Sequence, residues 1–126
     1  DAMTTGYWLA VALGGAIGSM GRAGISVWLP SVGAFPLPTF AVNLLGSLAI
    51  GLLWATLTRL DASAMWSAFV ITGVLGGFTT FSSFSLETLL LFEQGAWQTA
   101  LLYLALSLLT CVFGAGLGVG LIRLMA

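Results

Sequence analysis

Four long stretches without a single charged side chain constrain the fold of this chain more than any other feature. Each can hold the roughly 20 apolar residues that an α-helix needs to span a bilayer. Only 6% of the residues are charged and 60% are hydrophobic, whereas soluble domains carry about 25% charged residues, so the natural solvent of these segments is lipid. The stretches lie between Asp1 and Arg22, Arg22 and Arg59, Asp61 and Glu87, and Glu93 and Arg123.

The sequence predicts an all-α membrane protein with four transmembrane helices in a single integral domain, residues 1–126. Pro30 ends the first helix, and Pro38 or Thr39 begins the second, because proline suits the first helical turn. All five tryptophans lie near predicted helix ends, where membrane proteins concentrate aromatic side chains. The helices are expected at about 7–29, 38–58, 64–93 with a break near 76–80, and 97–124.

Several classes of protein are disfavoured by the charged and metal-binding residues. Three arginines, no lysine and a net charge of −1 leave no basic patch for nucleic acid. One cysteine, Cys111, and no histidine cannot form a zinc site or an internal disulfide. Without histidine or lysine, no base is placed to activate the many hydroxyls, so an enzyme is not expected. No cleavable signal peptide is expected, and Met3 is a candidate native start.

The arginines give only a weak preference for one orientation in the membrane. Arg59 and Arg123 fall on the side shared by both termini, while Arg22 lies towards the opposite side, which is a small bias under the positive-inside rule. Insertion in both orientations would permit an antiparallel homodimer with its two-fold axis in the membrane plane. Four helices of this size could hardly enclose an aqueous pore alone.

Glycines occur at helix-packing spacing in the last predicted helix. Small residues let helix backbones approach closely in lipid. The pairs Gly114/Gly118 and Gly116/Gly120 therefore predict packing faces.

The third segment departs from a regular helix in the run from Gly76 to Ser85, Gly-Gly-Phe-Thr-Thr-Phe-Ser-Ser-Phe-Ser. A helix from Met65 to Gly76 climbs about 18 Å, a little over half of a hydrocarbon core of about 30 Å, so the break falls near the bilayer midplane. Irregular backbone at that depth must be buried in protein or face water. A broken helix brings partial charges of both signs to one point, which can hold an ion. A glycine kink healed by the Thr79 and Thr80 hydroxyls is the competing interpretation.

Polar and aromatic residues follow the break on one stripe, Phe81, Phe84, Ser85 and Thr88, with Glu87 one turn beyond Phe84. Phenylalanine stripes usually only pack. These rings alternate with hydroxyls, however, and a ring edge carries positive partial charge that can face a dehydrated anion.

Other helices add polar groups inside the membrane. The Asn43 amide can donate two hydrogen bonds, either to an ion or as a link between helices. Arg22 and Glu87 are costly charges near the membrane interior, so they either neutralise each other or Arg22 draws anions to a vestibule. Tyr103, Ser107 and Thr110 form a hydroxylated face that is expected to turn inward.

The run from Gly76 to Ser85, followed by Glu87-Thr88, resembles the signature of the Fluc (CrcB) family of fluoride channels, and the likeness extends to Gly18, Arg22 and Asn43-Leu44-Leu45-Gly46. It implies a dual-topology antiparallel homodimer with two fluoride pores and a structural sodium ion held by the backbone carbonyls of Gly76 and Thr79. Arg22 matches a vestibule residue. One helical turn after Ser107 the family often has another small hydroxyl residue, where this chain has Cys111. Either Thr110 substitutes for that hydroxyl, or the row of polar side chains along the pore is shorter. The pore residues that the likeness implies are Asn43, Phe81, Ser82, Phe84, Ser85, Glu87, Thr88, Tyr103, Ser107 and Thr110.

The expected function is passive fluoride export across a bacterial inner (plasma) membrane, with fluoride, lipid and a second copy of the chain as partners. Hydroxyls, an amide and ring edges can replace fluoride's tightly held water without a fixed cation that would trap the ion. The main alternative is a small dual-topology cation or drug exporter. Such exporters rely on an intramembrane glutamate in the first helix, where this chain has only Arg22.

Overall fold

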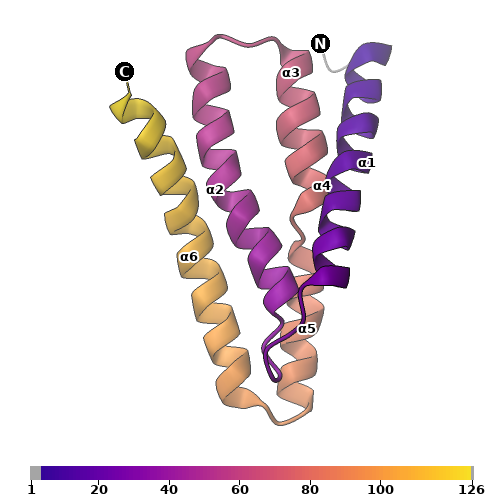
Figure 1. Ribbon diagram of the computed structural model, residues 1–126, viewed down its shortest axis with the longest axis vertical. Helices are drawn as coiled ribbons and strands as arrows, with labels where there is room; N and C mark the ends of the chain where they lie inside the picture. The colour runs from indigo at the N-terminus through magenta and orange to yellow at the C-terminus, as the bar shows by residue number, and fades with distance from the viewer. Residues whose placement is uncertain (1–3, 126) are drawn as a thin grey trace.

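The computed structural model describes residues 4–125, so the candidate start at Met3 lies outside the described residues. Those residues form a bundle of long helices (Figure 1). The third span is divided into four pieces, of which η1 is a π-helix. The elements are α1 (Thr5–Trp28), α2 (Leu37–Arg59), α3 (Ala64–Ser67), η1 (Ala68–Leu75), α4 (Gly76–Phe78), α5 (Phe81–Glu93) and α6 (Trp97–Leu124).

Four helical spans are long and apolar enough to cross a membrane: Thr5–Trp28, Leu37–Arg59, Ala64–Glu93 and Trp97–Leu124. Their bounds differ from the predicted ranges by at most two residues. The π-helix, by contrast, was not predicted from the sequence, in which η1 is simply an apolar run. Such wide helical turns are rare and often lie near functional sites.

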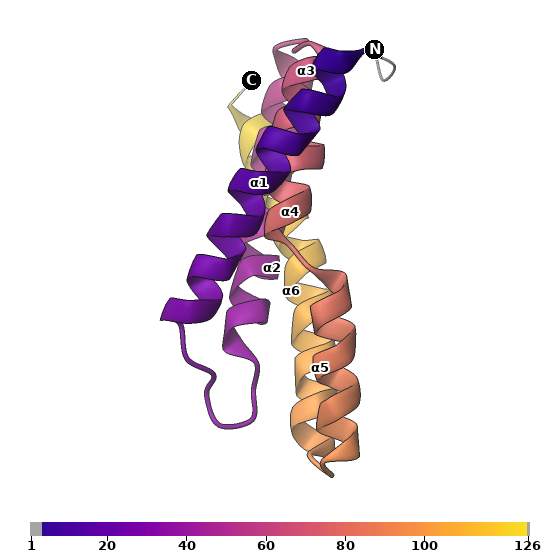
Figure 2. The same cartoon turned by 90° about the vertical axis from the view of Figure 1, so that its right-hand side faces the viewer.

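The chain runs up and down, and the turns alternate between the two ends of the bundle. The start of α1, the α2–α3 connection and the end of α6 lie at one end (Figure 1). The α1–α2 and α5–α6 connections lie at the other, with α5 and α6 reaching furthest (Figure 2). Most of the contacts of α2 are with α6, and α1 packs mainly on η1 and α4. The interrupted third span therefore has helices on more than one side.

Glycines bring the helix backbones together at two of these contacts. A Cβ added at Gly18 of α1 would collide with the backbone oxygen of Val74, and one added at Gly118 of α6 would meet Leu48 O at 2.6 Å. The Gly114/Gly118 pair thus packs as predicted. The prediction for Gly116/Gly120 is wrong within this chain, because nothing lies within 4 Å of a Cβ at either position. These two glycines face outward because they lie on a different side of α6 from Gly118.

Candidate functional site: a cavity at the helix break

The third span is broken at two threonines within the predicted 76–80 range. Thr79 (φ −87°, ψ 158°) and Thr80 (φ −149°, ψ 113°) have extended backbone, while Gly76-Gly77 remain helical. The Thr79 hydroxyl donates to Leu75 O at 3.0 Å. The Thr80 hydroxyl accepts from Ser83 N–H at 3.1 Å and so caps the start of α5. The Thr80 hydroxyl therefore satisfies a backbone N–H that the break would otherwise leave unpaired, whereas the Thr79 hydroxyl adds a second bond to Leu75 O, which also accepts from Thr79 N–H at 3.1 Å.

Asn43 of α2 holds the break from the opposite side. Its amide nitrogen donates to Thr80 O at 3.0 Å, and its amide oxygen accepts from Thr80 N–H at 2.8 Å. In an unbroken helix, Thr80 N–H would donate to the carbonyl of Gly76. Because Asn43 takes that donor, the Gly76 carbonyl is released from its helical partner. One N–H of the Asn43 amide is not used by these two bonds.

Arg22 and Glu87 do not neutralise each other; each bonds to a different group. Arg22 Nε donates to Gly77 O at 3.1 Å, at the carboxyl end of α4, where carbonyls carry partial negative charge. Glu87 Oε1 accepts from the Tyr103 hydroxyl at 3.1 Å. The arginine is thus a cap on the first half of the broken helix.

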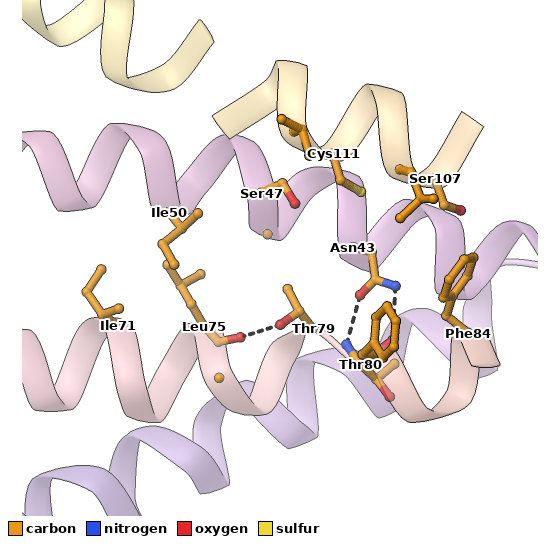
Figure 3. Close-up of a pocket in the computed structure, with 15 residues that line it drawn as sticks. Asn43, Ser47, Ile50, Ile71, Leu75, Thr79, Thr80, Phe84, Ser107 and Cys111 are labelled. Atoms are coloured by element: carbon orange, nitrogen blue, oxygen red, sulfur yellow. Dashed lines mark hydrogen bonds between the residues drawn. The ribbon is translucent and has the colours of Figure 1, made fainter. Parts of the chain in front are cut away.

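A cavity of about 330 Å³ opens beside the break, between the third span, α2 and α6 (Figure 3). None of the described side chains lining it is charged. It brings together six of the residues predicted for the pore or the sodium site and adds Ser47, Thr80 and Cys111, which the site prediction omitted. The six are Asn43, Gly76, Thr79, Phe81, Phe84 and Ser107.

Ser107 is the one buried polar side chain without a hydrogen-bond partner among the described residues. It is only 5% exposed and lines the cavity. Leaving a buried hydroxyl unpaired costs about 1 to 3 kcal/mol, so its position calls for a ligand or water. Near it, Phe84 packs against Tyr103 with ring centroids 5.0 Å apart.

Other predicted pore residues lie outside this cavity. The hydroxyls of Ser85, Thr88 and Thr110 each donate to the carbonyl four residues earlier in their own helix, at 2.6 to 2.9 Å. Tyr103 turns inward as predicted but is fully buried. Ser82 is exposed on α5.

Glu87 lines a separate hollow of about 200 Å³ beside the α1–α2 connection. Glu87 therefore lies in the middle of α5, outside the cavity at the break.

The choice between Thr110 and Cys111 is resolved by the side each faces. Cys111 lines the cavity, whereas the Thr110 hydroxyl bonds to Leu106 O at 2.6 Å. Within this chain, Cys111 and not Thr110 lines the cavity at the break.

Two of the residues that the site prediction omitted had sequence signals. Thr80 stands directly before a helix, where threonine is a favoured N-cap. Ser47 lies one helical turn after Asn43 and so shares its face.

Comparison with known proteins identifies the family of this chain. The profile of the family described as "CrcB-like protein, Camphor Resistance (CrcB)" matches residues 9–119. A Magnetococcus marinus protein named "Fluoride-specific ion channel FluC" is 48% identical over 120 residues, 91% of this chain and 96% of the relative. One of the same name from Agrobacterium fabrum is 48% identical over 115 residues, 87% and 92% of the two chains.

The relatives are bacterial, and four helical spans here are apolar enough to cross a bilayer. The protein is a multi-pass protein of a bacterial plasma membrane, and it belongs to the CrcB family.

Proposed function

We propose that this protein is a fluoride-selective channel that lets the ion leave the cell passively. Membership of a family whose relatives are named fluoride-specific channels supports a channel rather than an enzyme. The observation that carries the proposal is the uncharged cavity at the helix break, which is lined by Ser107 with its unpartnered hydroxyl.

The cavity offers the kinds of donor that a dehydrated fluoride ion needs. Asn43 keeps one amide N–H beyond its bond to Thr80 O, and the Ser107 hydroxyl has no acceptor among the described residues. Phe81 and Phe84 stand with ring centroids 5.5 Å apart and tilted by 51°, so ring edges can face an anion. Because no cation lines the cavity, a bound anion is held weakly enough to move on.

A second, antiparallel copy of the chain completes the conduction path in this proposal. The cavity is bounded by one chain only, and α5 exposes Phe81, Ser82 and Ser85 beside it. Polar groups at membrane depth are favoured where protein or water covers them. A two-fold related partner would cover this surface and make two equivalent pores, with fluoride ions, the partner chain and lipid as the partners of each chain.

The carbonyls at the break fit the structural sodium ion that the family implies. Gly76 O has lost its usual helical donor to Asn43, and Thr79 is in extended conformation. Unwound carbonyls and the carboxyl ends of half-helices are the groups that coordinate sodium in membrane proteins. Two carbonyls from each chain would hold the ion on the two-fold axis, where it would join the two broken helices.

Fluoride efflux from liposomes tests the channel. Vesicles containing the purified protein should release fluoride down its gradient, followed with a fluoride electrode, and should retain chloride in a parallel experiment. Equal release of both halides would exclude selectivity, and protein-free vesicles control for leakage.

Ser107→Ala tests the cavity itself. We expect fluoride efflux to fall about tenfold, because one donor at a dehydrated anion contributes about 1.5 kcal/mol, while thermal stability is kept because no hydrogen bond is lost. Thr56→Val is the matched control: its hydroxyl bonds only to Leu52 O, at 2.7 Å. If both variants conduct normally, the ion does not pass Ser107.

A further inference from the structure

Cys111 is the only cysteine in the chain, and it lines the cavity at the helix break. In Figure 3 it projects from α6 towards the space bounded by Asn43, Ser47 and Thr79. Most cysteines in membrane helices serve as small apolar side chains. This one instead borders the space that an ion crosses in the proposed function.

Ser107 provides an independent sign that a ligand binds here. It precedes Cys111 by four residues on α6, so helical geometry puts both side chains on one face, about 5 to 6 Å apart at Cβ. Ser107 is 5% exposed and lines the same cavity, and its buried hydroxyl oxygen has no partner among residues 4–125. The thiol and the unpartnered hydroxyl therefore belong to neighbouring residues that both line one uncharged cavity.

We propose that Cys111 and Ser107 bind a soft monovalent metal ion of the Cu(I) and Ag(I) class, and that the bound ion closes the pathway. Soft thiolate ligands select such metals. The S–H bond breaks, an S–Ag bond forms, and the proton leaves to water: RSH + Ag⁺ gives RSAg + H⁺. The product is neutral overall, so no unpaired charge is left in the cavity, and the Ser107 oxygen serves as a second, weaker ligand.

Blockage follows from where the metal sits, and this inference rests on the proposed channel function. The ion would occupy a cavity of about 330 Å³ beside Asn43 and Phe84. Once bound, the metal ion occupies the Ser107 oxygen and fills the space beside it, so a passing anion can use neither.

Silver added to fluoride-loaded liposomes tests the proposal, in chloride-free nitrate medium because silver fluoride is soluble and silver chloride is not. We expect efflux to fall about tenfold or more, since a metal ion held in a narrow polar path excludes the conducted ion. Cys111→Ser should conduct and resist silver, and Cys111→Ala provides a second thiol-free variant should the first fold poorly.

A displaced cysteine is the matched control. Leu109 is 70% exposed on α6 and does not line the cavity. In the double variant Leu109→Cys/Cys111→Ser, a thiol is present but should confer no silver block. Block in this variant, or in Cys111→Ser, would overturn the assignment.

Thiol protection gives a readout that does not depend on transport. Silver should slow maleimide labelling of Cys111 in the membrane-embedded protein, followed by intact mass. Protection without block would contradict a site in the pathway, and absence of both would contradict the site. If wild-type vesicles release no fluoride yet silver still protects Cys111, the metal site stands and the channel proposal fails.

Discussion

At the residue scale, the Asn43 amide connects α2 to both backbone groups of Thr80 at the break. It accepts from Thr80 N–H and donates to Thr80 O, at 2.8 and 3.0 Å. No other described side chain makes a paired bond of this kind to the interrupted backbone. The same side chain keeps a further N–H for the cavity, so its structural and ion-binding roles are combined.

Asn43→Ala should therefore destabilise the fold as well as slow fluoride. Two backbone groups of Thr80 lose their partners in a low-dielectric setting, at about 1 to 3 kcal/mol for each group. Thermal unfolding in detergent should show a clearly lower midpoint than wild type. Ser47→Ala, in the same cavity and on the same helix, should change stability little. An unaltered midpoint in Asn43→Ala would mean that the break needs no support from α2.

Substitutions at Phe81 and Phe84 can distinguish a role in conduction from a role in packing, because the two side chains differ in exposure. Phe81 is 71% exposed beside the cavity, whereas Phe84 is 5% exposed and packs on Tyr103. Phe81→Ile should slow fluoride efflux about tenfold, a loss of about 1.4 kcal/mol in ion stabilisation, and leave the dimer intact. Phe84→Ile should slow efflux and also lower the unfolding midpoint, because it opens a void. Unchanged efflux in Phe81→Ile would show that its ring only packs.

At the element scale, α1 and the third span are held together by glycine contact rather than by interlocking side chains. Gly18 lies against the Val74 carbonyl and the Phe78 backbone, and Arg22, one turn later, bonds to Gly77 O. In lipid, such close backbone approach replaces the hydrophobic drive that packs helices in water. The position of α4, and with it the break, depends on this contact.

Gly18→Ala should loosen the contact by about 1 to 3 kcal/mol, as overpacking does in tight cores. Its Cβ would meet Val74 O, a backbone atom that cannot rotate away. The control is Gly24→Ala, where nothing lies within 4 Å and alanine should stabilise the helix by up to about 1 kcal/mol. Chemical or thermal unfolding of both variants measures the difference. Equal stability of the two would indicate that α1 is free to shift away from η1.

The sequence was sufficient to predict the four spans because each is a long, mostly apolar segment and because prolines or short polar links separate them. It also predicted the region of the break, since Gly76-Gly77 and paired threonines are poor helix formers together. The partners of the break were not predictable. That Arg22 bonds Gly77 O rather than Glu87, and that Asn43 bonds Thr80, depend on how α1 and α2 are rotated about their axes.

That Gly116 and Gly120 do not pack within this chain has the same cause. Spacing alone gives two small-residue pairs on α6, Gly114/Gly118 and Gly116/Gly120, and only the rotation of α6 against α2 decides which pair packs. The Cys111 position was uncertain for this reason too, because Thr110 and Cys111 are neighbours about 100° apart around the helix.

At the scale of the whole molecule, the helix break and the proposed partner chain depend on each other. One chain supplies a cavity open on the side of Phe81 and the released carbonyl of Gly76. A lone protomer in lipid would leave this surface against acyl chains, which is unfavourable for polar backbone. A two-fold partner would cover it and bring a second pair of carbonyls to the same point.

Sodium dependence of dimer stability tests this coupling without measuring transport. If each dimer binds one sodium ion through the carbonyls of Gly76 and Thr79, every tenfold rise in sodium above the dissociation constant should stabilise the dimer by about 1.4 kcal/mol. The dimer's unfolding midpoint should therefore rise with sodium at constant ionic strength, with N-methylglucamine as the replacing cation. The same protein dissociated into protomers by excess detergent should show no such rise, because one chain supplies only half of the oxygen ligands. A midpoint that is independent of sodium in the dimer would remove the ion from the break, and the interrupted helix would then be supported by protein contacts alone, among them those of Asn43 and Arg22.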